Sequence, residues 1–196
     1  LCGGSLGGKA RGLGFARSMI TESGIREKFS GITIRVPKCT VIGTDEFDRF
    51  MKDNELWEKA LHLKDDKKLE KLFLKSKLSI DVMLKLESFI KENKKPLAVR
   101  SSSLLEDSQY QPLAGTYETF MLPNNSKSNK KRLNDIIKAI KKVYASTFKG
   151  EAKTLLDNTA HRIEEEKMAV IIQEIVGQTY SNNRFYPSFS GVLKSI

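Results

Sequence analysis

A short apolar run at residues 96–99, followed at once by Arg100 and three serines, constrains the fold of this 196-residue chain most strongly. The run predicts a short buried strand that ends by presenting Arg100. A guanidinium offers a rigid fork of donors that matches phosphate or carboxylate oxygens. Ser101 and the serines after it are small enough to let backbone N–H groups approach the same anion. The pattern therefore predicts a clamp for phosphate.

Two residues further along extend this interpretation. Gly115 would allow a close approach of the backbone to the ligand, and Thr119 would add a hydroxyl group. A plain structural alternative stays open, in which Arg100 forms an ion pair with Glu106 or Asp107 across a loop.

The start of the chain is a second candidate anion site. Six glycines fall within the first fourteen positions, and a helix-like pattern follows from Leu13. A glycine loop that leads into a helix directs unpaired N–H groups and the helix dipole at a ligand, and Lys9 could reach that ligand. Residues 3–9 also match the first part of a P-loop, but Ala10 replaces the hydroxyl residue that would hold magnesium, so we reject a P-loop. A simple linker is the alternative.

The remaining elements alternate between strand and helix patterns. Residues 32–42 predict a bent strand or a strand pair around Pro37, and residues 118–122 and 190–192 predict further strands. Helical spacing runs through residues 56–93 and 130–148. In the first of these segments we expect an apolar face formed by Ile80, Met83, Leu84, Leu86, Phe89 and Ile90. The class predicted is α+β.

A continuous apolar run at residues 168–172 predicts a strand buried on both faces. It ends in the polar pair Gln173 and Glu174, and Val176 and Gly177 follow. Backbone donors and acceptors in such a hinge can read the edge of a flat heterocycle, and a polar side chain can reach ribose hydroxyls. We therefore interpret this segment as a base-binding hinge.

Composition narrows the class of protein. The net charge is +10, but the lysines are spread over predicted helices that also carry acids, which favours a solvated surface over a nucleic-acid footprint. No apolar run is long enough to cross a bilayer. Two cysteines, Cys2 and Cys39, are too few for a disulfide framework or a zinc site, and no signal peptide is visible, so we expect a cytoplasmic protein. The first residue is Leu1, and we expect a piece of a longer polypeptide.

Several blocks occur in an order that resembles one known family. GGKARGLG, VPKCTVI, AVRSSSLLEDSQYQPLAGTYETF, an ASTF-terminated helix, MAVIIQEIV and SGV together resemble the N-terminal nucleotide-binding domain of the phosphoenolpyruvate synthase and pyruvate phosphate dikinase family. The likeness covers nearly the whole chain. It implies the N-terminal portion of an ATP-grasp-like domain, with residues 1–165 as a first lobe and residues 166–196 as the hinge and the start of a second lobe.

The resemblance also implies roles for particular residues. Lys9 and Arg100 are similar to the family's phosphate-contacting lysine and arginine, and both are expected in catalysis. The remaining nucleotide-binding positions that it implies are Ser101, Gly115, Thr119, Gln173, Glu174 and Val176. Where the family has a G-Q-x-E-T-like segment, this chain has GTYET.

The implied activity is a phosphotransferase that uses ATP. A phosphoryl group would move to a histidine on a separate domain of the same polypeptide, and then to pyruvate or a related acceptor. The family's Mg²⁺ ligands and its phosphohistidine and phosphoenolpyruvate domains would lie beyond Ile196, so the chain alone is expected to be inactive and to hold no metal. A module that senses nucleotide without turnover is the alternative, and we expect no nucleic-acid or membrane partner.

Overall fold

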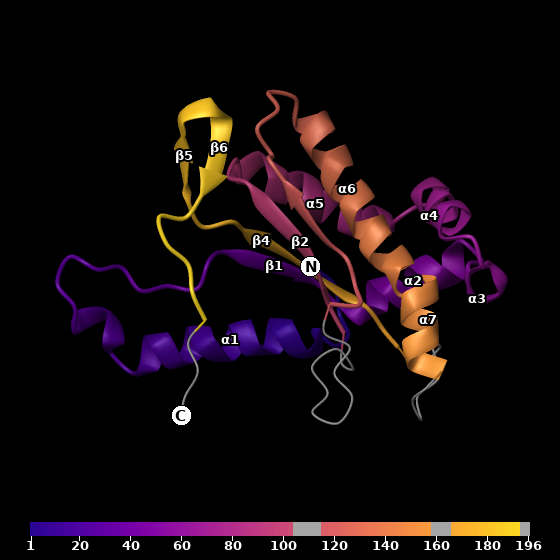
Figure 1. Ribbon diagram of the computed structural model, residues 1–196, viewed down its shortest axis with the longest axis horizontal. Helices are drawn as coiled ribbons and strands as arrows, with labels where there is room; N and C mark the ends of the chain where they lie inside the picture. The colour runs from indigo at the N-terminus through magenta and orange to yellow at the C-terminus, as the bar shows by residue number, and fades with distance from the viewer. Residues whose placement is uncertain (104–114, 158–165, 193–196) are drawn as a thin grey trace.

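An antiparallel sheet forms the centre of the computed structural model, which describes residues 1–103, 115–157 and 166–192. Within these residues the sheet has four strands in the order β1 (Cys39–Ile42), β4 (Ala169–Glu174), β2 (Leu97–Ser102) and β3 (Thr119–Leu122). The strand predicted from the run before Arg100 is therefore confirmed as β2. It lies between β4 and β3 and pairs with both of them (Figure 1).

Helices cover one face of this sheet (Figure 1). The longest, α6 (Asn129–Ser146), packs on β2 and β3 and also contacts α4 and α5. The other helices after β1 are α2 (Thr44–Asp53), α3 (Trp57–His62), α4 (Asp66–Lys75), α5 (Ile80–Glu92) and α7 (Gly150–Asp157). The α+β class and the helical interpretation of residues 130–148 are confirmed.

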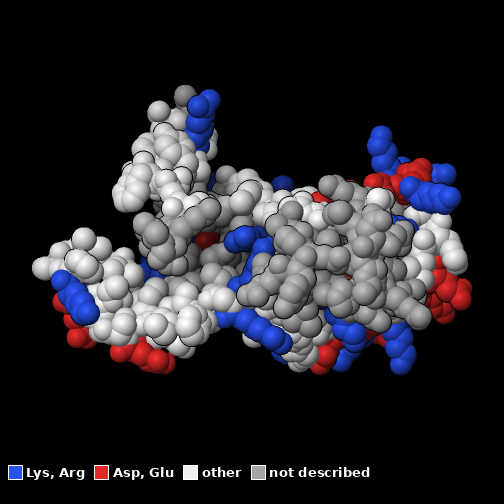
Figure 2. Space-filling model, turned by 60° about the horizontal axis from the view of Figure 1, so that its bottom comes forward, with Lys and Arg blue, Asp and Glu red and all other residues white. Residues whose placement is uncertain are grey.

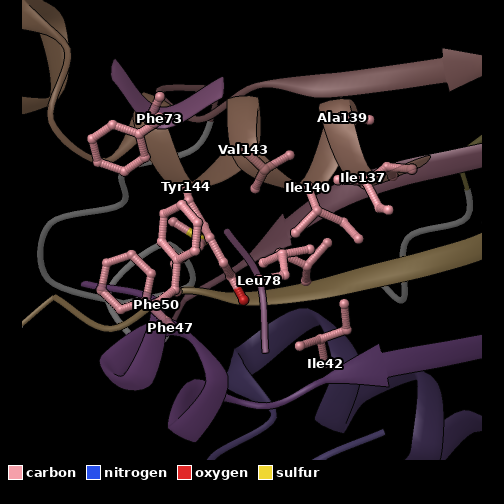
Figure 3. Close-up of a cluster of buried hydrophobic side chains, with 14 of the residues drawn as sticks. Ile42, Phe47, Phe50, Phe73, Leu78, Ile137, Ala139, Ile140, Val143 and Tyr144 are labelled. Carbon is pink, nitrogen blue, oxygen red and sulfur yellow. The ribbon is translucent and has the colours of Figure 1, made fainter. Parts of the chain in front are cut away.

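The hydrophobic core lies between the sheet and these helices. Phe47 and Phe50 of α2, Phe73 of α4 and Tyr144 of α6 are fully buried and contact one another (Figure 3). Aromatic rings in such edge-on and tilted pairs contribute about 0.5–1.5 kcal/mol beyond the burial of their area. The core therefore holds the covered face of the sheet in place.

Side chains of a strand alternate between the two faces of its sheet. In β2, Leu97 and Val99 belong to the core cluster, so Arg100 and Ser102 project from the other face. The register places Thr119 of β3 and Gln173 of β4 on that same face. We call it the Arg100 face.

The first helix, α1 (Gly7–Glu22), begins earlier than the glycines suggest. The expected loop up to Leu13 is wrong from Gly7 onward, because Gly7, Gly8 and Gly12 lie within the helix. Tertiary contacts with β2 at the first turn compensate for the weak helix propensity of glycine. A 3₁₀ turn at Ile25–Glu27 follows.

Three other local predictions need correction. Only Cys39–Ile42 of the predicted strand at residues 32–42 is a strand. In α5, Val82, Leu86 and Ile90 are buried, whereas Ile80, Met83 and Leu84 are exposed, so the apolar face is narrower than the sequence suggests. Residues 190–192 form no strand.

A hairpin that we did not predict follows β4 and stands above the sheet (Figure 1). It consists of β5 (Gln178–Tyr180) and β6 (Arg184–Tyr186), joined by a 3₁₀ turn at Ser181–Asn183. The rings of Tyr180 and Tyr186 stack at 4.0 Å between centroids. Two strands of three residues are too short to show a reliable alternation in the sequence, and this cross-strand pair stabilises the hairpin.

The predicted lobe boundary at residue 165 lies shortly before β4. β4 lies within the range in which we expected the hinge and the start of a second lobe, and it pairs with β1 and β2 of the preceding part. The division at residue 165 stays a prediction, as does the ATP-grasp architecture. No helix among the described residues has the length and apolarity needed to span a membrane.

Candidate nucleotide-binding site

Arg100 lies at the centre of the Arg100 face, half-buried, with polar neighbours on both adjacent strands. Its guanidinium donates a hydrogen bond to Oε1 of Gln173 at 3.5 Å. Thr119, which is exposed, is the register partner of Arg100 on β3. Antiparallel pairing thus gathers three of the residues predicted for the site from segments that are far apart in the sequence.

Lys9 approaches the same strand from α1. Its Nζ lies 3.4 Å from Oγ of Ser101, the residue that follows Arg100. Ser101 is fully buried, and alternation turns it away from the Arg100 face. The two cations, Lys9 and Arg100, therefore flank the carboxyl-terminal half of β2.

The predicted anion site at the amino end of α1 needs a correction. The protein itself uses three of the first four N–H groups of the helix: Gly8 donates to the carbonyl oxygen of Ser103 at 3.0 Å, and Ala10 donates to Oγ of Ser102 at 3.1 Å. Gly7 donates to Oγ of Ser5 at 3.3 Å. These bonds dock the helix on the end of β2. Any anion bound here would meet the side chain of Lys9 and not the helix terminus.

The hinge segment lines a cavity beside the hairpin. The cavity has a volume of about 560 Å³, and Glu174, Val176 and Phe185 are among its lining residues. Lys95 forms an ion pair with Glu174 at 3.2 Å. Val176 is 60% exposed, so an apolar side chain in the cavity wall is available to a planar ligand.

The hollowed surface between the hairpin and α1 can be followed in a space-filling view, where lysine and arginine atoms gather at its margin (Figure 2). A second cavity, of about 620 Å³, lies on the other side of the hairpin and shares Lys95, Ile175 and Phe185 with the first. The hairpin thus forms a wall common to both cavities. Sequence reasoning did not identify this wall.

Gly115 lies on the segment that leads into β3, and Thr119 is the first residue of that strand. Gly115 has a φ of +84°, a left-handed conformation that favours glycine. It is exposed, and within the described part of the chain no atom lies within 4 Å of the position that a Cβ would take. Glu106 and Asp107, the alternative partners of Arg100, lie outside the described residues.

The strand that carries Thr119 is fixed from the core side. Glu118 forms an ion pair with Lys149, and Lys149 also contacts Glu70 at 3.4 Å. Lys142 lies 2.8 Å from Glu70 and 5.5 Å from the ring centroid of Phe120. These partly exposed charges of alternating sign join β3 to the helices that cover it.

These contacts shift the pKa values of Glu70 and Lys149. The hydrogen bond from Lys142, followed by the charges of Lys142 and Lys149, lowers the pKa of Glu70 against a smaller effect of burial. Burial alone would lower the pKa of Lys149, but the hydrogen bonds and charges of Glu118 and Glu70 outweigh it and raise that pKa. Both shifts favour the charged forms, so this cluster is a structural support of β3.

A buried hydrogen bond joins the segment before β3 to the segment before β4. The hydroxyl of Tyr117 donates to Oε1 of Glu166 at 2.9 Å, and both side chains are at least 95% buried. Tyr117 precedes β3 and Glu166 precedes β4, on either side of the end of β2. The GTYET segment gave no sign of this bond in the sequence, because its partner lies 49 residues away.

The Arg100 face, Lys9 beside β2 and the hinge cavity all belong to one α+β domain. The model of the pyruvate phosphate dikinase AMP/ATP-binding domain matches residues 4–196, and the chain belongs to this family.

One curated protein is similar to this chain over a part of its length. An uncharacterized phosphotransferase of Bacillus subtilis (strain 168), YvkC, is 28% identical over 149 residues. The aligned segment covers 74% of this chain and 16% of that protein. The chain therefore corresponds to a small part of the relative.

Proposed function

We propose that this chain is the ATP-binding part of a phosphotransferase resembling phosphoenolpyruvate synthase. The intact polypeptide transfers a phosphoryl group from ATP to a carrier histidine, and then to pyruvate or a related acceptor. Membership of the AMP/ATP-binding family supports the nucleotide, and the name of the Bacillus relative supports the reaction class. The ATP-grasp architecture is part of the same proposal.

The observation that carries the proposal is the convergence of Arg100, Thr119 and Gln173 on one face of the sheet. A guanidinium beside a hydroxyl matches the oxygens of a phosphate group. The bond to Gln173 holds the guanidinium in place before the nucleotide arrives, so little ordering is needed on binding.

The base would lie in the hinge cavity, against Val176 and the backbone of residues 174–177. Along β4, Glu174 lies three positions after Ile171, the register partner of Arg100. At about 3.4 Å per residue this is roughly 10 Å, a distance that an extended nucleoside triphosphate can span. Gln173, between the two ends, would meet the ribose.

In this arrangement Lys9 and Arg100 would stabilise charge on the transferring phosphoryl group. Phosphoryl transfer depends mainly on positioning and on electrostatic stabilisation, and the protein need not form a covalent bond in this part of the reaction. Ser101 would hold the ammonium of Lys9 through the 3.4 Å contact.

Mg²⁺ would neutralise the phosphate oxygens when bound with ATP. The described residues contain no group of three His, Cys, Asp or Glu that could hold a metal. As part of the same proposal, the metal ligands lie in another part of the polypeptide, together with the carrier histidine and the acceptor-binding domain.

The test is the product formed by the intact polypeptide from ATP and pyruvate. We expect AMP, separated by chromatography, and strongly reduced AMP formation in the Lys9→Ala and Arg100→Ala variants. Lys131→Ala is the matched control, because Lys131 is exposed on α6 and its side chain pairs with Asp135, four residues further along the same helix, at 3.1 Å. Binding of ATP without any AMP would indicate a sensing module and refute the enzymatic proposal.

A further inference from the structure

The hydroxyl of Ser102 joins β2 to α1. It accepts a hydrogen bond from the N–H of Ala10 at 3.1 Å and donates one to the carbonyl oxygen of Leu6 at 2.8 Å. Ser102 is fully buried. One hydroxyl group therefore binds both the residue before the helix and the fourth residue within it.

The residue at the N-cap of α1 is Leu6, which makes no side-chain capping bond. Locally, Oγ of Ser5 accepts only from the N–H of the first helical residue, Gly7, at 3.3 Å. Ser102 supplies the oxygen for the N–H of Ala10, deeper in the first turn, as an N-cap serine, threonine or aspartate ordinarily does. This second cap comes from a strand that is 92 residues away in the sequence.

Ser102 lies between the helix that carries Lys9 and the strand that carries Arg100. Lys9 lies in the first turn of α1, between the residues that Ser102 binds. Arg100 lies two residues before Ser102 on the same face of β2. A shift of the helix start would move the ammonium of Lys9 while the guanidinium of Arg100 stays on the sheet.

We propose that Ser102 is a positioning residue that sets the Lys9 ammonium relative to the Arg100 guanidinium by capping α1 from β2. This inference rests on the proposed function. It explains why the serines after Arg100 differ in what they do: Ser101 contacts Lys9, Ser102 caps α1 and the backbone of Ser103 accepts from Gly8. Displacements of about 1 Å can cost a reaction two orders of magnitude.

The test is a double-mutant cycle in the intact polypeptide, with the dissociation constant of ATP as the readout. Ser102→Ala is expected to weaken ATP binding about fivefold to thirtyfold, the range that corresponds to a lost N-cap. In the Lys9→Ala background the same change is expected to have less than about a twofold effect, because its action passes through Lys9.

Ser128→Ala is the matched control. Ser128 caps α6 by accepting from the N–H of Lys131 at 3.3 Å, and α6 carries none of the proposed nucleotide ligands. We expect this variant to lose a similar amount of thermal stability and to keep its affinity for ATP. Equal effects of Ser128→Ala and Ser102→Ala on ATP affinity would show a general loss of stability and overturn the inference.

Two further outcomes distinguish the positioning role of Ser102 from the proposed function. If Lys9→Ala weakens ATP binding but Ser102→Ala has the same effect in both backgrounds, or none, the positioning role is refuted and the proposed function stands. If neither variant changes ATP affinity, the proposed function fails, and the inference fails with it. Faster amide hydrogen exchange at Ala10 in Ser102→Ala would confirm that the cap itself was lost in that variant.

Discussion

Gly7 of α1 lies so close to β2 that a Cβ at this position would be 1.8 Å from the carbonyl oxygen of Ser102. Its φ of +72° is also in the left-handed region that favours glycine. The contact is with backbone, which cannot turn away as a flexible side chain could. The junction between the helix that carries Lys9 and the strand that carries Arg100 therefore requires glycine.

Gly7→Ala is predicted to displace the start of α1 and to lower the free energy of unfolding by about 2 kcal/mol or more. Gly12→Ala is the control, because Gly12 is exposed in the same helix and no atom of the described residues beyond its own helix lies within 4 Å of the Cβ that this change would introduce. We expect Gly12→Ala to be neutral or to stabilise by up to about 1 kcal/mol. Urea unfolding of both variants distinguishes them, and equal effects would contradict the close contact at Gly7.

The cluster around Glu70 predicts a specific dependence of stability on pH. The pKa of Glu70 is lowered in the folded protein, mainly by Lys142. Its contribution to stability is therefore complete above its unfolded pKa of about 4.3, and is lost as pH falls through the lower, folded value. Glu70→Gln should destabilise the protein at pH 7, and the difference from the unmodified protein should shrink toward pH 3. A difference that stays constant between these pH values would argue against the ion pairs.

Tyr144 has a hydroxyl that is fully buried and has no hydrogen-bond partner among the described residues. Burial, followed by the charge of Glu46, raises its pKa well above the usual value. Tyr144→Phe removes the unsatisfied group and keeps the ring, so we predict unchanged stability or a gain of about 1 kcal/mol in thermal unfolding.

Tyr117→Phe provides the opposite case, because the hydroxyl of Tyr117 donates to buried Glu166. This variant is predicted to lose about 1–3 kcal/mol. If Tyr144→Phe destabilised the protein as much as Tyr117→Phe does, Tyr144 would have a partner that the described residues do not show.

The sequence predicted those parts of the fold that depend on local pattern. The apolar runs before Arg100 and before Gln173 are strands, and the periodic residues 130–148 correspond to α6, because burial imposes its period on the sequence. The antiparallel register that brings Arg100 and Gln173 together is not encoded in either segment alone. It depends on the pairing of β2 with β4, which are about 70 residues apart.

The start of α1 could not be predicted from local pattern. Glycines at positions 7, 8, 12 and 14 favour a loop by their propensity, but the protein forms a helix there because Ser102 and Ser103 bind its first turn. From the sequence, the serines after Arg100 were interpreted as residues small enough to let backbone N–H groups approach a phosphate, and that stays a prediction. The hydroxyl of Ser102 and the carbonyl group of Ser103 also bind the helix, which could not be predicted without knowing which helix lies against the strand.

The affinity of the intact polypeptide for ATP, measured by titration calorimetry for the unmodified protein, Arg100→Ala and Lys131→Ala, tests the nucleotide site most directly. The account predicts that Arg100→Ala binds ATP about tenfold to a hundredfold more weakly, as the loss of a charge-assisted hydrogen bond implies. Lys131→Ala should bind like the unmodified protein. Equal ATP affinity in all three proteins would contradict the assignment of the Arg100 face to phosphate.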